Sequence, residues 1–126
     1  MPLFTHIVVG TNNTAGAASF YDAALGGLGI EPEQRGPRRF YRRDGNAFVV
    51  GPPLNGHPAT SANGGTISFF AETKAQVDAF HAGGLASGGR CDGPPGRREN
   101  APNNAYGAYL LDPDGNKVAA FSFEPD

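Results

Sequence analysis

The sequence predicts an α+β fold: two βαβββ modules whose curved mixed sheets enclose a cavity. Three observations support this prediction: frequent turn residues, alternating strand-like and helix-like segments, and a repeat of that order in the two halves. Of 126 residues, 19 are Gly and 11 are Pro, which is about double ordinary usage. Nine Phe and four Tyr in patterned runs argue against a disordered chain, and such frequent turn residues exclude a helical bundle.

The first half of the chain contains one strand, one helix and a meander of further strands. Residues 4–9 are rich in β-branched and aromatic side chains, which is typical of a strand. Turn and N-cap residues at 11–14 precede apolar residues at helical spacing, and glycines within 26–29 end that helix. Two strands within 40–50 then flank Asp44-Gly45-Asn46, which is a hairpin signal.

The second half repeats this order after a Gly- and Pro-rich loop at 52–65. Residues 66–71 form a predicted strand. Thr73 and Gln76 are spaced as a capping box, which predicts the start of a second helix. The remaining predicted segments are a loop over 91–104 and strands over 106–111 and 118–123.

The two halves also match residue by residue. A shift of 60 residues places Phe20 on Phe80, and a shift of 70 places Asp44-Gly45-Asn46 on Asp114-Gly115-Asn116. In a module with one helix, one face of the sheet is left uncovered, and we expect the cavity on that face. The prediction is a single domain over 1–126, with module one at about 1–55 and module two at about 62–126.

Composition narrows the function classes. A net charge of −2 and a sequence pI near 5.9 argue against a nucleic-acid binder driven by charge. No apolar run approaches the roughly 20 residues of a membrane span, and the N-terminal residues lack a signal-peptide pattern. Cys91 is the single cysteine, so neither a disulfide framework nor a zinc cluster is predicted. We therefore expect a cytoplasmic protein with a small-molecule partner, and no nucleic-acid or membrane partner.

Three segments carry a resemblance to a known family. They are the run from Leu111 to Val118 around an Asp-Pro-Asp-Gly-Asn turn, the start at His6–Val9 followed by Phe20-Tyr21, and the run from Gln76 to His81. These segments resemble the vicinal oxygen chelate superfamily, which includes glyoxalase I, the bleomycin resistance proteins and the extradiol dioxygenases. The resemblance covers essentially the whole chain. It implies the two-module fold and, as in many relatives, a homodimer.

The resemblance also implies where a metal would be bound. Enzymes of the superfamily carry a divalent metal on inward-facing residues from the first and last strands of each module. Carried over to this chain, the four positions are His6, Val49, Thr66 and Ala119. Only His6 is a metal-ligand type, whereas such sites use three or four nitrogen or oxygen donors. We therefore expect no cofactor; the alternative is a divalent metal held by atypical ligands that include His6.

The predicted lining of the cavity favours binding. Because Tyr106 and Tyr109 are three residues apart on one strand, they point to opposite faces and at most one lines the cavity. The resemblance implies a small-molecule-binding protein of the bleomycin-resistance type without the usual metal site. The alternative is a glyoxalase-like lyase or dioxygenase-type metalloenzyme, and without a metal His6 is the candidate general base. The candidate ligand-binding residues are His6, Val49, Thr66, Ser68, Tyr106, Tyr109, Ala119 and Phe121.

One charged cluster has two interpretations. Five arginines lie within nine residues, and the planar guanidinium group matches carboxylates and phosphates. The other interpretation is a solvated edge hairpin that resists pairing with other chains, and charge runs favour it. Strand alternation places Phe40 and Arg42 on one face and Arg39 and Tyr41 on the other. The cluster consists of Arg35, Arg38, Arg39, Arg42 and Arg43.

Overall fold

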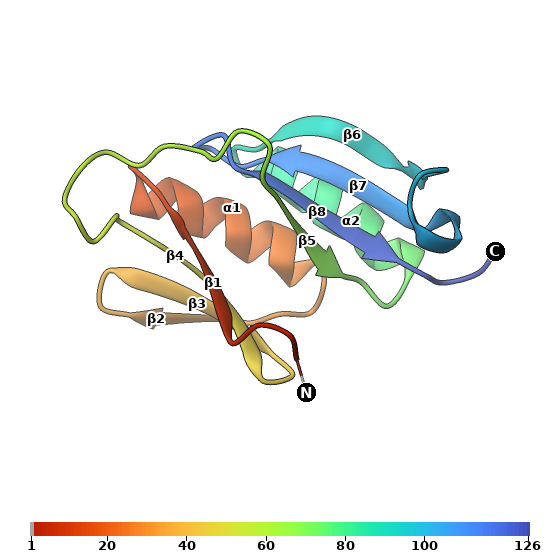
Figure 1. Ribbon diagram of the computed structural model, residues 1–126, viewed down its shortest axis with the longest axis horizontal. Coiled ribbons are helices and arrows are strands. Elements are labelled where there is room, and N and C mark those ends of the chain that lie inside the picture. Colours follow the sequence, from red (N-terminus) through yellow and green to blue (C-terminus); the bar gives the residue numbers. More distant parts are fainter. Residues whose placement is uncertain (1) are drawn as a thin grey trace.

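The computed structural model describes residues 2–126, and each half follows the predicted order of strand, helix and three strands (Figure 1). Module one contains β1 (His6–Gly10), α1 (Thr14–Gly26), β2 (Pro32–Arg35), β3 (Arg38–Arg43) and β4 (Asn46–Gly51). Module two contains β5 (Thr66–Phe70), α2 (Lys74–Ala86), β6 (Arg90–Arg97), the short 3-10 helix η1 (Pro102–Asn104), β7 (Tyr106–Leu111) and β8 (Lys117–Ser122).

The strands form two mixed sheets of four strands each. The strand order is β1-β4-β3-β2 in sheet one and β5-β8-β7-β6 in sheet two. In each sheet the first and last strands of the module pair in parallel, and the other pairs are antiparallel. The α+β fold of two βαβββ modules is therefore confirmed. The two sheets are separate, and they are not closed around a cavity within the chain.

The strand registers show that the modules are equivalent. His6 pairs with Ala47 in sheet one, and Thr66 pairs with Lys117 in sheet two. Thr66 lies 60 residues after His6, and Lys117 lies 70 residues after Ala47, so the two pairs are related by the same offsets as the sequence repeat. The repeat seen in the sequence is thus a repeat of hydrogen-bonded geometry.

The segment after α2 differs from the prediction. Residues 91–104 were expected to form a loop, but Arg90–Arg97 is strand β6. Pro94 and Pro95 are compatible with it because β6 is an edge strand, where a missing N–H leaves no ladder bond unmade. The register shifts on either side of Gly93. A strand that is irregular and rich in Pro and Gly has no sequence pattern of its own.

Side chains cap both helices at their N-termini. The Asn13 side chain accepts a hydrogen bond from the Gly16 N–H at the start of α1. The Thr73 hydroxyl does the same for the Gln76 N–H at the start of α2, and the Gln76 side chain accepts from the Glu72 N–H. Caps of this kind satisfy amide groups that have no partner within the helix.

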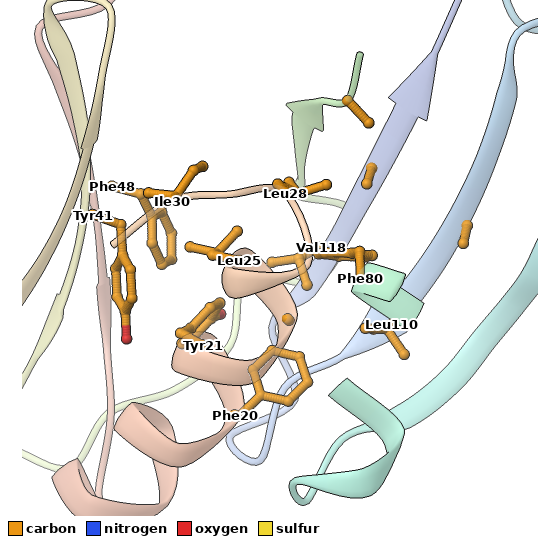
Figure 2. Packing of buried hydrophobic residues seen from close by; sticks show 14 of the residues in the cluster. Phe20, Tyr21, Leu25, Leu28, Ile30, Tyr41, Phe48, Phe80, Leu110 and Val118 are labelled. Atoms are coloured by element: carbon orange, nitrogen blue, oxygen red, sulfur yellow. The ribbon is translucent and has the colours of Figure 1, made fainter. Parts of the chain in front are cut away.

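Both modules share one hydrophobic core. Figure 2 shows Tyr41 and Phe48 of sheet one and Leu110 and Val118 of sheet two directed toward the same interior, with α1 between the sheets. Phe20 on α1 is fully buried there. Each sheet therefore has one face covered by helices and one face without a helix.

Polar contacts also connect α1 to its surroundings. The Tyr21 hydroxyl donates to Asp112 Oδ2 over 2.6 Å, which ties α1 to the β7–β8 turn of module two. Burial and the nearby Asp112 carboxylate hold the pKa of Tyr21 well above its ordinary value. Asp22 accepts hydrogen bonds from Arg39 and Tyr41, which tie the same helix to β3. Helix α1 thus forms side-chain hydrogen bonds to strands or turns of both modules.

The closest approach of the two helices predicts a large effect of one glycine. A Cβ added at Gly27 would lie 2.7 Å from both the Ala79 carbonyl carbon and the Phe80 nitrogen, whereas a Cβ at Gly26 would meet nothing within 4 Å. We expect Gly27→Ala to lower the free energy of unfolding by about 1–3 kcal/mol, because backbone atoms cannot move aside. Gly26→Ala is the matched control and should be neutral or stabilising by up to about 1 kcal/mol. Urea unfolding measures both, and equal effects would contradict the close contact.

The Asp22 network predicts a pH-dependent contribution to stability. Burial raises the pKa of Asp22, but hydrogen bonds from Arg39 and Tyr41 and the charge of Arg39 outweigh it and hold the pKa below 3.8. A lowered carboxyl pKa stabilises the fold above the unfolded pKa, and this contribution is lost as the pH falls through the folded pKa. We expect wild type to exceed Asp22→Asn in unfolding free energy at pH 7 and the gap to shrink below about pH 4. A gap that stays constant between pH 7 and pH 3 in urea unfolding would refute this.

Candidate functional site

The candidate site lies on the two sheet faces that no helix covers, which we call bare face one and bare face two. Along each strand, residues alternate between the core and the bare face. In β1, Ile7 and Val9 pack on the core, so His6 and Val8 lie on bare face one. In β5, Ile67 and Phe69 pack on the core. Bare face two therefore contains Thr66, Ser68 and Phe70 from β5, Lys117, Ala119 and Phe121 from β8, and Gly107, Tyr109 and Leu111 from β7.

The four positions implied by the family resemblance all lie on the bare faces, two on each. His6 and Thr66 are the exposed first residues of β1 and β5. Val49 and Ala119 are only 2% and 0% exposed, because neighbouring side chains cover these small residues. In neither sheet are the two positions direct strand partners. Val49 pairs with Val8, two residues after His6, and Ala119 pairs with Ser68, two residues after Thr66.

The other candidate residues are divided between the two sides of sheet two. Ser68 pairs with Ala119, and Phe121 packs edge-on against Tyr109 with ring centroids 5.6 Å apart, all on bare face two. Tyr106 lies on the helix side, where its hydroxyl donates to Asp78 on α2 over 2.6 Å. That hydrogen bond raises the pKa of Tyr106. The structure therefore places Tyr109, and not Tyr106, beside the other candidates.

The donor set near His6 does not fit the metal site of the family. The His6 Nδ1 atom lies 3.0 Å from the hydroxyl oxygen of its neighbour Thr5. Val49 and Ala119 have no donor atom, and a Thr66 hydroxyl is a weak ligand. Among residues 2–126, no three His, Cys, Asp or Glu side chains come together in a group that could hold a metal ion. Among residues 2–126, no carboxylate hydrogen-bonds to the His6 ring or forms an ion pair with it, so none orients it as a base.

A cavity lies at one end of bare face one. Its volume is about 450 Å³, and it is formed between the end of β1 and the loop that connects the modules. Its lining includes Val8 and Gly10 from β1 and Pro53 and Leu54 from the loop, and Arg38 provides the charged group. The loop carries no recognisable motif, so the cavity could not be located from the sequence.

The arginine cluster is divided by strand alternation between the two sides of sheet one. On bare face one, the guanidinium carbons of Arg35 and Arg42 lie 5.8 and 4.8 Å from the Phe40 ring centroid. Glu33 pairs with both of these arginines. Arg38 lies on the same face, opposite Arg35 in the β2–β3 register. Two of the five arginines therefore lie beside one aromatic ring, and a third lies on the same face.

The other two arginines of the cluster have structural partners. Arg39 donates to both carboxylate oxygens of Asp22 on α1, and Arg43 donates to the Phe70 carbonyl at the end of β5. The first ion pair raises the pKa of Arg39 above its ordinary value. The predicted opposition of Arg42 and Arg39 on the two faces is confirmed.

Bare face two carries a similar arrangement. The Lys117 ammonium and the Arg98 guanidinium lie 4.6 and 5.5 Å from the Tyr109 ring centroid. Asp92 pairs with Lys117 over 3.1 Å. Arg98 also donates to the Gly96 and Pro94 carbonyls. Sequence reasoning missed this group because its members come from three separate segments and share no motif.

A further pair of reactive side chains lies on the helix side of sheet two. His81 Nε2 on α2 is 3.1 Å from the sulfur of Cys91 on β6. Burial lowers the pKa of His81, and the Asp78 carboxylate opposes that shift. Because Cys91 pairs with the core residue Leu110, this pair is directed away from the bare faces and is separate from the candidate site.

Comparison with protein families agrees with this geometry. The model of the Glyoxalase/Bleomycin resistance protein/Dioxygenase superfamily matches residues 3–120. The chain belongs to this superfamily, and the family resemblance of the sequence is confirmed. A search of curated proteins found no match. No helix in residues 2–126 is both long enough and apolar enough to cross a bilayer.

Solved structures show the same fold. A glyoxalase/bleomycin resistance protein from Albidiferax ferrireducens is 45% identical, with a TM-score of 0.89 over 98% of this chain and 100% of that one. A glyoxalase-related enzyme from Fulvimarina pelagi is 19% identical, with a TM-score of 0.74 over 97% and 88% of the two chains. A lactoylglutathione lyase from Agrobacterium tumefaciens is 21% identical, with a TM-score of 0.66 over 97% and 94%. The last two similarities concern the fold alone.

Proposed function

We propose that this protein binds a small organic molecule on its bare sheet faces and does so without the divalent metal of the family's enzymes. One observation carries the proposal: the positions that would hold the metal are present on the bare faces, but three of the four are Val49, Thr66 and Ala119. Without a set of donors, the site lacks the Lewis acid that isomerase and dioxygenase reactions of this kind require.

The surface around these positions is suited to binding. On bare face two, the rings of Tyr109 and Phe121 offer flat apolar contact area on the face that also carries the hydroxyls of Thr66 and Ser68. Phe40 offers a further ring on bare face one. Ligand sites commonly combine an apolar lining with a few polar groups that set orientation. The cavity of about 450 Å³ beside Val8 lies within the usual size range for small ligands. The ligand would be a compact molecule that contacts rings and hydroxyls.

Elemental analysis and a thermal-shift screen test this function together. We expect purified protein to contain no stoichiometric Mn, Fe, Ni or Zn, and at least one compound from a small-metabolite panel to raise the Tm. A ligand at one hundred times its Kd adds about 2.7 kcal/mol of stability, which is several degrees for a domain of this size. Stoichiometric metal that is lost in His6→Ala but retained in the loop control His57→Ala would overturn the proposal. It would favour a metalloenzyme with atypical ligands instead.

We also infer that two copies of the chain associate through their bare faces. Within one chain the helix-covered faces meet in the core, so the bare faces are free to face another molecule. Val8 on β1 is 49% exposed and Phe70 on β5 is 53% exposed. A second copy is the partner that fits, because its equivalent modules offer matching curved faces and a sheet on each side of a shared ligand cavity.

Sedimentation equilibrium tests this pairing. We expect wild type to have twice the chain mass of 13.1 kDa, and Val8→Asp to sediment as a single chain, because the substitution replaces an apolar side chain buried between the two copies with a carboxylate. Leu85→Asp is the matched control: Leu85 is 43% exposed on α2, away from the bare faces. A wild-type mass of 13.1 kDa, or dissociation by the control alone, would contradict the inference; far-UV circular dichroism checks that each variant is folded.

A further inference from the structure

The charges of this protein are separated between its surfaces. The bare faces carry six of the ten Lys and Arg residues but only two of the twelve acidic residues, Glu33 and Asp92. The chain as a whole has a net charge of −2, so the surface that we propose as the binding site has the opposite sign to the molecule. The six cations are Arg35, Arg38 and Arg42 on face one and Arg90, Arg98 and Lys117 on face two.

The four remaining cations have partners elsewhere. Arg39 pairs with Asp22, and Arg43 donates to a backbone carbonyl. Lys74 and Arg97 both pair with Asp126 near the end of β8. The cations that stabilise the fold are therefore distinct from those on the bare faces.

The cations on the bare faces have few ion-pair partners within the protein. Arg38 and Arg90 form no ion pair with any residue between 2 and 126. Arg35 and Arg42 share one carboxylate, that of Glu33, and their side chains remain 63% and 48% exposed. A guanidinium group carries five N–H donors in a planar fork. Most of the N–H donors of Arg35, Arg38 and Arg42 are thus available to a ligand.

The same constellation occurs in both modules. Its two rings occupy equivalent positions, because Phe40 pairs with Val49 and Tyr109 pairs with Ala119, whereas its cations come from positions that the repeat does not relate. In each bare face a ring on the third strand of the module, Phe40 or Tyr109, has two cations within 6 Å of its centroid. In module one both cations come from β2 and β3, whereas in module two one comes from β8 and the other follows β6. Duplication therefore accounts for the position of the two rings but not for the cations beside them.

We propose that the ligand of the bare faces is an anion, a small organic acid with a carboxylate or phosphate group bound by the arginines of β2 and β3. Arg35 and Arg42, whose guanidinium groups both lie beside the Phe40 ring, hold the oxyanion, because a guanidinium fork matches two oxygens at once. Arg38 adds a third cation on the same face, at the cavity. The Phe40 ring stacks against the apolar part of the ligand. This inference rests on the proposed binding function and adds the chemical class of the ligand.

Nuclear magnetic resonance titrations with three probes of similar size test the ligand class. The probes are phenyl phosphate, benzyl alcohol and benzylammonium, which carry a negative charge, no charge and a positive charge. We expect phenyl phosphate to shift the amide signals of β2, β3 and the cavity, and to bind more weakly as salt is raised from 20 to 300 mM, roughly from a 20 Å to a 6 Å Debye length. The other two probes should bind at least about tenfold more weakly.

Two neighbouring arginines provide matched variants. Arg42→Gln removes a cation from bare face one and should weaken phenyl phosphate binding by about tenfold or more, the usual effect of losing a charged hydrogen bond. Arg43→Gln is the control, because Arg43 is the next residue on the same strand and faces the opposite side. Its affinity for phenyl phosphate should stay within about twofold of wild type. Unchanged amide dispersion confirms that both variants are folded.

The outcomes separate this proposal from the binding function on which it rests. Binding of benzyl alcohol or benzylammonium as tight as that of phenyl phosphate would overturn the anionic class and leave the binding function in place. Failure of all three probes, together with an empty metabolite screen, would overturn both. Equal losses in Arg42→Gln and Arg43→Gln would also overturn the proposal, because the effect would then not come from the bare face.

Discussion

The close contact between α1 and α2 is the constraint on which the rest of the molecule depends. Gly27 at the end of α1 lies against the backbone of α2 at Ala79 and Phe80, and Gly83 on α2 lies equally close to Ala23. At this separation the two helices form one layer between the sheets, so the covered faces of both sheets face a common core (Figure 2). Because side chains in such interiors are close-packed, the relative position of the modules is set here.

The orientation of the bare faces follows from this contact. With the helices and the apolar faces directed inward, the opposite sheet faces are left to solvent and to whatever binds there. The residues that stabilise the core and the residues of the proposed ligand site thus lie on different sides of the same strands. On β3, Tyr41 packs in the core and Arg39 forms the ion pair with Asp22, while Phe40 and Arg42 lie on bare face one.

Much of the fold could be predicted from the sequence, because the information was local. The turn Asp44-Gly45-Asn46 and its counterpart at 114–116 mark equivalent hairpins, and the capping residue Thr73 marks the start of α2. The edge strand β6 could not be predicted, because Pro94, Pro95 and glycines hide a strand that pairs on one side only. Its formation depends on β7, which offers a free edge only in the folded sheet.

The sequence alone determined the two-module fold, which residues of a strand share a face, and the shortage of metal donors beside His6. These follow from periodicity and from residue chemistry, which do not depend on distant parts of the chain. Only the tertiary structure decided that the two bare faces do not close on a cavity, that Arg35, Arg38 and Arg42 lie on a bare face, and that Arg98 and Lys117 meet at Tyr109. Such contacts join residues far apart in the chain, and packing of α1 against α2 creates the surfaces on which they lie.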